Sequence, residues 1–199
     1  MKFKDYIDDN TALIMVDLQN DFGDPEGSLY VKGGEDLVDI VNEAYDIYND
    51  LGNINILWTM DSHPADHCSF VENNGLWPAH CVVDCWGWKF MENLRIYDYP
   101  DTVIRKGTNK DIDSYSAFFD NEKKSCTKLD SYLKARKIKK NIVMGLATEY
   151  CDKFTVMDSL FLGYETAIYL PGCRGVNLKE GDVDNAILEM EKAGAVLLE

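Results

Sequence analysis

The sequence predicts an α/β protein with three layers, in which helices flank a central, mostly parallel sheet on both faces. Two observations carry this prediction. Short continuous apolar runs alternate with longer amphipathic segments, and such runs are typical of strands that are buried on both faces. Strand–helix–strand units of this kind join parallel strands through right-handed crossovers. The length of 199 residues suits a single domain over residues 1–199.

The strands are predicted from the short apolar runs. The first run, TALIMVD, ends in a carboxylate at Asp17. Pro171-Gly172 is expected to break the fifth strand, because proline cannot donate a hydrogen bond to a neighbouring strand. The predicted strands cover residues 11–17, 55–59, 102–105, 141–146, 165–170 and 195–198.

The helices are predicted from apolar residues at steps of three and four. In the first helix, Leu37, Val41 and Ala44 share one face. Gly163 and Gly194 follow the ends of two later helices, where glycine often forms the C-cap. The predicted helices cover residues 36–50, 125–137, 149–162 and 182–192.

A long irregular segment, residues 61–101, contains all three histidines of the chain, His63, His67 and His80, and opens with Asp61. Carboxylate and imidazole groups together suit Zn, Fe or Mn. Positions two apart in an extended segment point the same way, so Asp61 and His63 can reach one ion, and His80 would complete the set. Irregular loops of this length are usually functional, and the segment is therefore predicted to be a metal-site loop.

A structural zinc site is the alternative for this loop. It would use Cys81 and Cys85 with His80, in a non-catalytic module where Cys151 is inert. We rank this alternative second, because Cys81 and Cys85 have no C-x2-C pair elsewhere in the chain to complete a zinc knuckle.

Composition narrows the classes of partner and compartment. A net charge of −15 argues against a nucleic-acid backbone and against an anionic membrane surface, because both attract basic proteins. No signal peptide or apolar run long enough to span a bilayer is visible. Six cysteines in such a chain are expected to be free thiols, and we expect a cytoplasmic protein.

The candidates for chemistry all follow the ends of predicted strands. Asp17 ends the first, Asp61 and His63 follow the second, Lys106 follows the third, and Cys151 follows the fourth. Parallel sheets bind ligands at the carboxyl ends of their strands, so these residues are expected at one edge. The start of a helix is expected to lower the pKa of the Cys151 thiol, and a carboxylate beside it could move its proton. Taken singly, Cys151 could be a buried structural cysteine, Asp17 a turn cap and Lys106 a solvated surface charge. Their position at one edge of the predicted sheet favours a catalytic site instead.

Six motifs then indicate a family. In order along the chain they are Val16-Asp17-Leu18-Gln19-Asn20-Asp21-Phe22, Asp61-Ser62-His63, Trp77-Pro78-Ala79-His80-Cys81, Arg105-Lys106-Gly107, Asp113-Ser114-Tyr115-Ser116-Ala117-Phe118 and Gly145-Leu146-Ala147-Thr148-Glu149-Tyr150-Cys151. With them, the chain resembles the nicotinamidases and pyrazinamidases of the isochorismatase-like cysteine hydrolase superfamily nearly end to end.

The resemblance implies an amidohydrolase that converts nicotinamide to nicotinate and ammonia through a cysteine thioester, in NAD salvage, and that also cleaves pyrazinamide. The implied roles are catalysis for Asp17, Lys106 and Cys151, metal binding for Asp61, His63 and His80, stacking on the substrate ring for Phe22 and Trp77, and an oxyanion hole for the amides of Ala147 and Cys151. The metal would be one divalent ion, zinc before iron or manganese. The resemblance also implies a cis peptide at Leu146-Ala147.

Several points stay open at this stage. His67 is either an extra metal ligand or an exposed histidine beside the ligands. A related hydrolase acting on carbamoyl or ureido compounds would keep Asp17, Lys106 and Cys151 but would lack the metal set. The substrate is a small molecule in either case, and homo-oligomerisation stays open.

Overall fold

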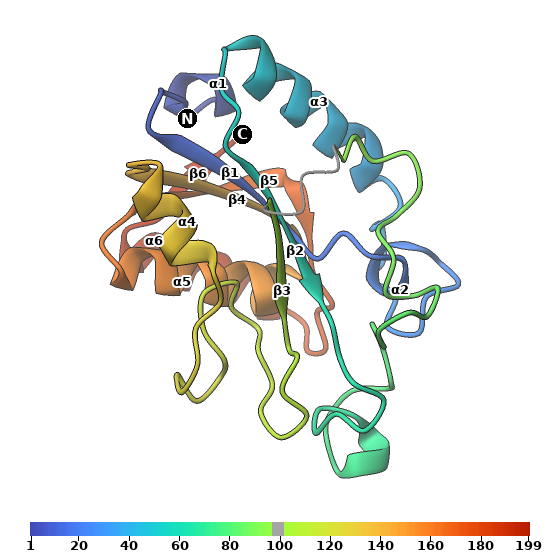
Figure 1. Ribbon diagram of the computed structural model, residues 1–199. Helices are drawn as coiled ribbons and strands as arrows, with labels where there is room; N and C mark the ends of the chain where they lie inside the picture. Colours follow the sequence, from blue (N-terminus) through green and yellow to red (C-terminus); the bar gives the residue numbers. More distant parts are fainter. Residues whose placement is uncertain (97–101) are drawn as a thin grey trace.

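The computed structural model of the protein describes residues 1–96 and 102–199. Six parallel strands form one sheet in the order β3-β2-β1-β4-β5-β6 (Figure 1). The strands are β1 (Thr11–Val16), β2 (Ile56–Asp61), β3 (Val103–Lys106), β4 (Lys140–Leu146), β5 (Glu165–Arg174) and β6 (Val196–Leu198). The end of the predicted 61–101 loop falls on residues 97–101, outside the described residues.

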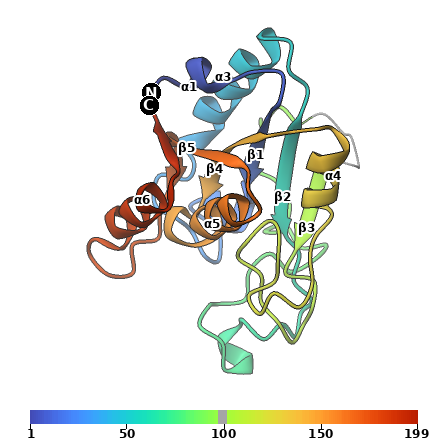
Figure 2. The same cartoon turned by 90° about the vertical axis from the view of Figure 1, so that its left-hand side faces the viewer.

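Helices cover the sheet on both faces, which confirms the predicted three-layer architecture (Figures 1 and 2). One face carries α1 (Phe3–Tyr6) and α3 (Leu37–Asp50), and the other carries α4 (Leu129–Ala135), α5 (Lys153–Phe161) and α6 (Asp182–Ala193). Two short elements, α2 (Asn20–Gly23) and η1 (Val71–Asn73), lie in loops. None of the described helices combines the length and the apolar character needed to cross a membrane.

The core explains why the strands are continuous apolar runs. Every residue of β1 and β2 is buried, because each side chain meets a helical layer on one face or the other. On α3, Leu37, Val41 and Tyr48 turn inward, and the Tyr48 hydroxyl donates to the Thr11 carbonyl at 2.6 Å. Burying one Leu or Ile side chain contributes about 1.5–3 kcal/mol, so these runs hold the sheet together.

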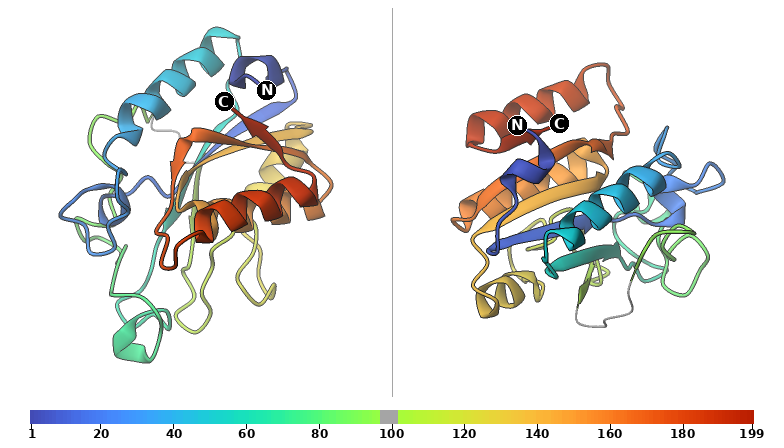
Figure 3. Two further views of the ribbon diagram at one scale, coloured as in Figure 1. Left: turned by 180° about the vertical axis from the view of Figure 1, so that it is seen from behind. Right: turned by 90° about the horizontal axis from the view of Figure 1, so that it is seen from above.

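The strand order reverses between β1 and β4, where the chain begins to build the sheet in the other direction. Loops that follow β2 and β3 extend beyond the carboxyl ends of the strands at this point (Figure 1). The two termini lie side by side, next to the edge strand β6 (Figure 3). The Phe3 amide donates to the Glu199 carbonyl at 3.3 Å there.

The predicted helix over 125–137 is too long. Helix α4 begins at Leu129 because the preceding backbone is held by other partners. The Thr127 amide donates to the Phe118 carbonyl at 2.9 Å, and the Ser125 amide donates to the Asp120 carboxylate at 2.8 Å. Cys126 also pairs with Phe119 in an antiparallel bridge, so the backbone is extended here and the helix starts later.

The predicted end of the fifth strand before Pro171-Gly172 is also wrong. Strand β5 continues to Arg174, and its pairing with β4 shifts register between Val143 and Gly145. Residues 169–172 therefore bulge opposite the shift, where Pro171 needs no amide hydrogen for the ladder.

The helix predicted over 149–162 is two elements. Thr148–Asp152 forms a π-helical turn, η3, and α5 follows it from Lys153. The Asp152 amide reaches back five residues to the Ala147 carbonyl at 3.2 Å. Such turns are rare and occur often at functional sites.

Candidate active site

Four neighbouring strands, β3, β2, β1 and β4, deliver the predicted residues to one edge of the sheet. Lys106 ends β3, Asp61 ends β2, Asp17 follows β1, and Cys151 lies in η3 just after β4. All four are buried, and Lys106 is only 2% exposed. A buried ammonium group requires charged or polar partners, because desolvation otherwise makes it very costly.

Lys106 has those partners. Its Nζ lies 2.8 Å from Asp17 Oδ2 and 2.5 Å from Asp61 Oδ1. It also lies 3.3 Å from Cys151 Sγ and donates to the Ser114 carbonyl at 3.0 Å. One ammonium group therefore links the thiol to both carboxylates.

Asp17 is fixed by its own backbone and by β2. Its φ angle is 49°, in the left-handed region that aspartate tolerates better than most residues. The Thr59 hydroxyl donates to Asp17 Oδ1 at 2.6 Å and accepts from the Asp17 amide at 3.1 Å. The carboxylates of Asp17 and Asp61 and the sulfur of Cys151 lie within 4.8 Å of one another.

The expectation of a lowered thiol pKa is wrong. Burial raises the pKa of Cys151 well above its ordinary value; Lys106 opposes this shift, while Asp17 adds to it. Burial likewise raises the pKa of Asp17, against the influence of Lys106. Burial disfavours the charged Lys106, but Asp17 and Asp61 outweigh it and hold the lysine pKa well above its usual value.

The predicted metal ligands also come together. The ligand atoms of Asp61, His63 and His80 lie within 4.8 Å of one another. The Nε2 atoms of His63 and His80 lie 3.4 and 3.9 Å from Asp61 Oδ2. Nδ1 of His63 contacts the Gly107 carbonyl at 2.9 Å, and Nδ1 of His80 contacts the Pro78 carbonyl at 2.8 Å. These carbonyls orient the rings as carbonyl partners do behind metal-binding histidines.

The site fits a divalent ion by its chemistry. His63 Nε2 is buried without a hydrogen-bond partner among the described residues, and a metal ion would satisfy it. Burial raises the pKa of Asp61, but Lys106 and His63 more than offset this effect, so the carboxyl pKa is lowered and the group is an anion. One carboxylate and two imidazoles suit Zn, Fe or Mn.

His67 is not exposed, contrary to one of the two expectations for it. Its side chain is fully buried and stacks on His63 with the ring centroids 4.0 Å apart. Nδ1 of His67 lies 2.7 Å from the Ser69 hydroxyl, and burial lowers the pKa of His67 to about 4. His67, His63 and Asp113 form a second group whose ligand atoms lie within 4.8 Å of one another.

The alternative zinc site does not assemble. Among the described residues, the groups of ligand atoms that converge do not include Cys81 with Cys85 and His80. Cys81 is buried, whereas Cys85 is exposed. Burial raises the pKa of the Cys81 thiol well above its ordinary value, which disfavours the thiolate that zinc requires.

A cavity opens beside Cys151, lined by both predicted ring-binding residues, Phe22 and Trp77. The Trp77 indole donates to the Tyr115 hydroxyl at 3.1 Å, which sets the angle of its ring. The peptide between Leu146 and Ala147 is cis, as the resemblance implied. The residues that line the cavity are Phe22, Leu29, Val31, Asp61, Trp77, His80, Asp113, Tyr115, Ala147, Tyr150, Cys151 and Val176.

Sequence reasoning gave no role to several residues of this cavity. Asp113, Tyr115 and Tyr150 lie inside quoted motifs, so the motifs themselves were a signal. Gln19 also lies in a motif; its side-chain amide donates to the Asp61 carbonyl at 2.9 Å and its oxygen accepts from the Asp61 amide at 2.8 Å. Leu29 and Val31 carried no such signal.

Comparison with known proteins identifies the family of this chain. The isochorismatase domain model matches residues 11–199. A nicotinamidase of Escherichia coli is 41% identical over 201 residues, which cover 94% of this chain and 93% of the relative. A pyrazinamidase of Pyrococcus horikoshii, solved in complex with zinc, is 34% identical with a TM-score of 0.83, covering 96% of this chain and 99% of the other. The protein PnC1 from L. infantum, solved in complex with nicotinate, is 33% identical with a TM-score of 0.84, covering 96% of this chain and 93% of the other. The chain therefore belongs to the isochorismatase domain family.

Proposed function

We propose that this protein is a nicotinamidase, a hydrolase that converts nicotinamide to nicotinate and ammonia in NAD salvage. One observation carries the proposal: the Cys151 thiol, the Asp17 carboxylate and the Lys106 ammonium converge beside a cavity that Phe22 and Trp77 line. The relatives that match over at least 90% of their own length include nicotinamidases of three bacteria and of Saccharomyces cerevisiae, and a nicotinamidase of Schizosaccharomyces pombe matches over 74% of its length.

In the first half of the reaction, Asp17 takes the proton of the Cys151 thiol. The sulfur forms a bond to the carboxamide carbon, and the Asp17 proton passes to the nitrogen as the C–N bond breaks and ammonia leaves. Burial raises the pKa of Asp17 as well as that of Cys151, so this carboxylate is a stronger base than an ordinary one.

In the second half, a water molecule adds to the thioester carbon and gives a proton to Asp17. The C–S bond breaks, the proton returns from Asp17 to sulfur, and nicotinic acid leaves and gives its own proton to solvent to become nicotinate. Lys106 stabilises the carboxylate and the sulfur in both halves through its contacts at 2.8 and 3.3 Å. We assign the oxyanion to the backbone amides of Ala147 and Cys151, at the turn between β4 and η3.

We propose that Asp61, His63 and His80 hold one divalent ion, with zinc first because a related pyrazinamidase was solved with zinc. Bound there, the ion would supply a Lewis acid for the pyridine nitrogen and for water. The convergence of these three ligands argues against the carbamoyl and ureido hydrolases, which are expected to lack the set.

Ammonia release by the metal-loaded, reduced protein tests the proposal. We expect release from nicotinamide and from pyrazinamide, which keeps the ring nitrogen and the carboxamide. Benzamide is the matched control, because it has the carboxamide and a flat ring but no ring nitrogen, and we expect slower turnover. Absence of ammonia from nicotinamide would overturn the assignment.

Three broader predictions join this proposal. The family match over residues 11–199 supports a single domain over the whole chain. The six unpaired cysteines support a cytoplasmic location. The net charge of −15 supports a small-molecule substrate without nucleic-acid or membrane partners.

A further inference from the structure

We propose that Glu149 is a positioning residue that fixes one wall of the cavity by holding the segment after β5, residues 175–177. This inference rests on the proposed function for its kinetic consequence, but its structural part stands on contacts that do not involve the metal ligands or the catalytic groups.

The Glu149 carboxylate has an unusual pair of partners. Its side chain is 7% exposed, and it lies in η3, two residues before Cys151. Oε2 accepts from the Val176 amide at 3.3 Å, and Oε1 accepts from the Asn177 amide. Hydrogen bonds from backbone amides to a buried carboxylate are among the stronger ones in proteins.

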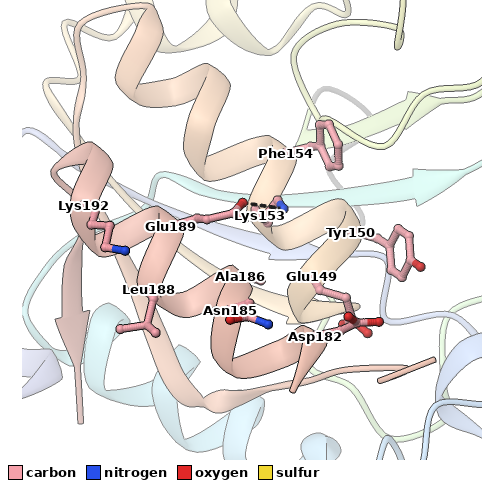
Figure 4. A pocket seen from close by; sticks show the side chains of 10 residues that line it. All are labelled: Glu149, Tyr150, Lys153, Phe154, Asp182, Asn185, Ala186, Leu188, Glu189 and Lys192. Atoms are coloured by element: carbon pink, nitrogen blue, oxygen red, sulfur yellow. Dashed lines mark hydrogen bonds and ion pairs between the residues drawn. The ribbon is translucent and has the colours of Figure 1, made fainter. Parts of the chain in front are cut away.

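The segment that Glu149 holds has no other regular structure. Strand β5 ends at Arg174, and α6 begins at Asp182, so residues 175–177 belong to neither element. Figure 4 shows the Glu149 side chain pointing from η3 toward the start of α6, where Asp182 lies. The Glu149 carboxylate therefore supplies the hydrogen-bond acceptors that these two amides would otherwise find in a strand or a helix.

The backbone at Gly175 packs directly against the Glu149 carboxylate and Val183. A Cβ atom at position 175 would lie 2.5 Å from Glu149 Oε2 and 2.2 Å from Val183 Cγ2, so a side chain there would collide. Glycine lets the backbone approach the carboxylate. The contact thus depends on residues from η3, from the loop and from α6.

The segment held by Glu149 forms part of the cavity wall near Cys151. Val176 lines the same cavity as Cys151, Phe22 and Trp77. Because the η3 turn carries both Glu149 and Cys151, the position of Val176 is set relative to the sulfur by one rigid element. We call the contact between the Glu149 carboxylate and the amides of Val176 and Asn177 the latch. Without the latch, Val176 would no longer have a fixed position in the cavity wall, and substrate would bind in more orientations.

The kinetic test compares Glu149→Ala with Glu149→Gln. We expect Glu149→Ala to raise KM for nicotinamide by roughly tenfold, which corresponds to about 1.4 kcal/mol, with a smaller effect on kcat. Glu149→Gln keeps one acceptor oxygen and is expected to give an intermediate KM. Glu180→Ala is the matched control, because Glu180 is an exposed carboxylate of the same loop, and it should leave KM unchanged.

Hydrogen exchange followed by mass spectrometry tests the latch without any turnover. We expect faster exchange in Glu149→Ala in a peptide covering residues 171–181, with unchanged exchange in the sheet. If wild-type protein releases no ammonia from nicotinamide, the proposed function fails, and this exchange experiment alone decides the latch.

A double-mutant cycle with Val176→Ala completes the design. If Glu149 acts through Val176, the two effects on KM should be less than additive. The inference is overturned if Glu149→Ala leaves loop exchange unchanged, if exchange rises equally across the whole protein, or if kcat falls as much as kcat/KM.

Discussion

At the scale of single residues, the site concentrates buried charge at one point. Lys106 is surrounded by Asp17 and Asp61, and its ammonium also touches the Cys151 sulfur. Removing one partner of such a group leaves an uncompensated buried charge, which costs about 3–5 kcal/mol. Cys151 is different, because Lys106 keeps both carboxylate partners when the cysteine side chain is shortened.

Cys151→Ala should therefore lower kcat for nicotinamide by roughly 10³-fold or more while leaving the fold intact. The nucleophile is lost, but the cavity and the cluster of Asp61, His63 and His80 remain. Metal content and calorimetric binding of nicotinamide are the controls. Near-normal turnover by this variant would exclude the thioester route.

A second residue-scale prediction concerns Asp152, which is fully buried. Neither carboxyl oxygen has a hydrogen-bond partner among the described residues, and burial raises the pKa of Asp152 well above its ordinary value, although the Cys173 thiol opposes the shift. Below about pH 4, Asp152 is protonated in the folded and the unfolded chain. Above it, the unfolded chain ionises first, so the folded state loses stability as pH rises toward the folded pKa.

Asp152→Asn should remove this loss. We expect the variant to gain on the order of 1–3 kcal/mol over the wild type near neutral pH, with a gap that widens from pH 5 to pH 8. Urea unfolding at several pH values measures the gap. A gap that stays constant with pH would mean that Asp152 is ionised in the folded protein.

At the scale of elements, the ends of the strands position the site residues, and a glycine after β3 leaves room for the His63 ring. Gly107 follows β3 with φ at +62°, and a Cβ atom there would lie 2.4 Å from the His63 ring. Its carbonyl also holds Nδ1 of that ring. The end of β3 therefore orients a residue that follows β2.

Gly107→Ala should weaken zinc binding by roughly tenfold or more, because the ring must move when its supporting partner shifts. Gly163→Ala is the matched control: Gly163 also has positive φ, at +89°, but no atom lies within 4 Å of the added Cβ. Both variants carry backbone strain of about 1 kcal/mol, and only Gly107→Ala should change zinc affinity in a chelator competition. Equal affinities in the two variants would contradict the proposed role of His63.

At the scale of the whole molecule, the metal ligand His80 is not part of the hydrophobic core, although its loop adds Cys81 and Met91 to that core. The core lies between the sheet and its two helical layers, whereas His80 comes from the loop beyond the strand ends. Loss of metal should therefore affect the site more than the fold.

His80→Ala should abolish most zinc binding and most nicotinamide turnover, while its thermal unfolding midpoint should match that of wild-type protein treated with chelator. Zinc stabilises only what binds it, so the wild type should gain stability on adding zinc and the variant should not. Metal analysis and thermal unfolding with and without zinc check this. Unfolding of the wild type by chelator alone would show that the metal is structural.

The sequence by itself determined the layers of the fold and the edge at which Asp17, Asp61, Lys106 and Cys151 meet. Continuous apolar runs identify buried strands, and parallel strands bring their carboxyl ends together, so local pattern was enough. Only the tertiary structure decided the burial of His67, the raised pKa of Cys151 and the contact of Glu149 with the segment after β5. Desolvation and contacts between residues 27 or more positions apart depend on how elements pack, and no local spacing encodes them.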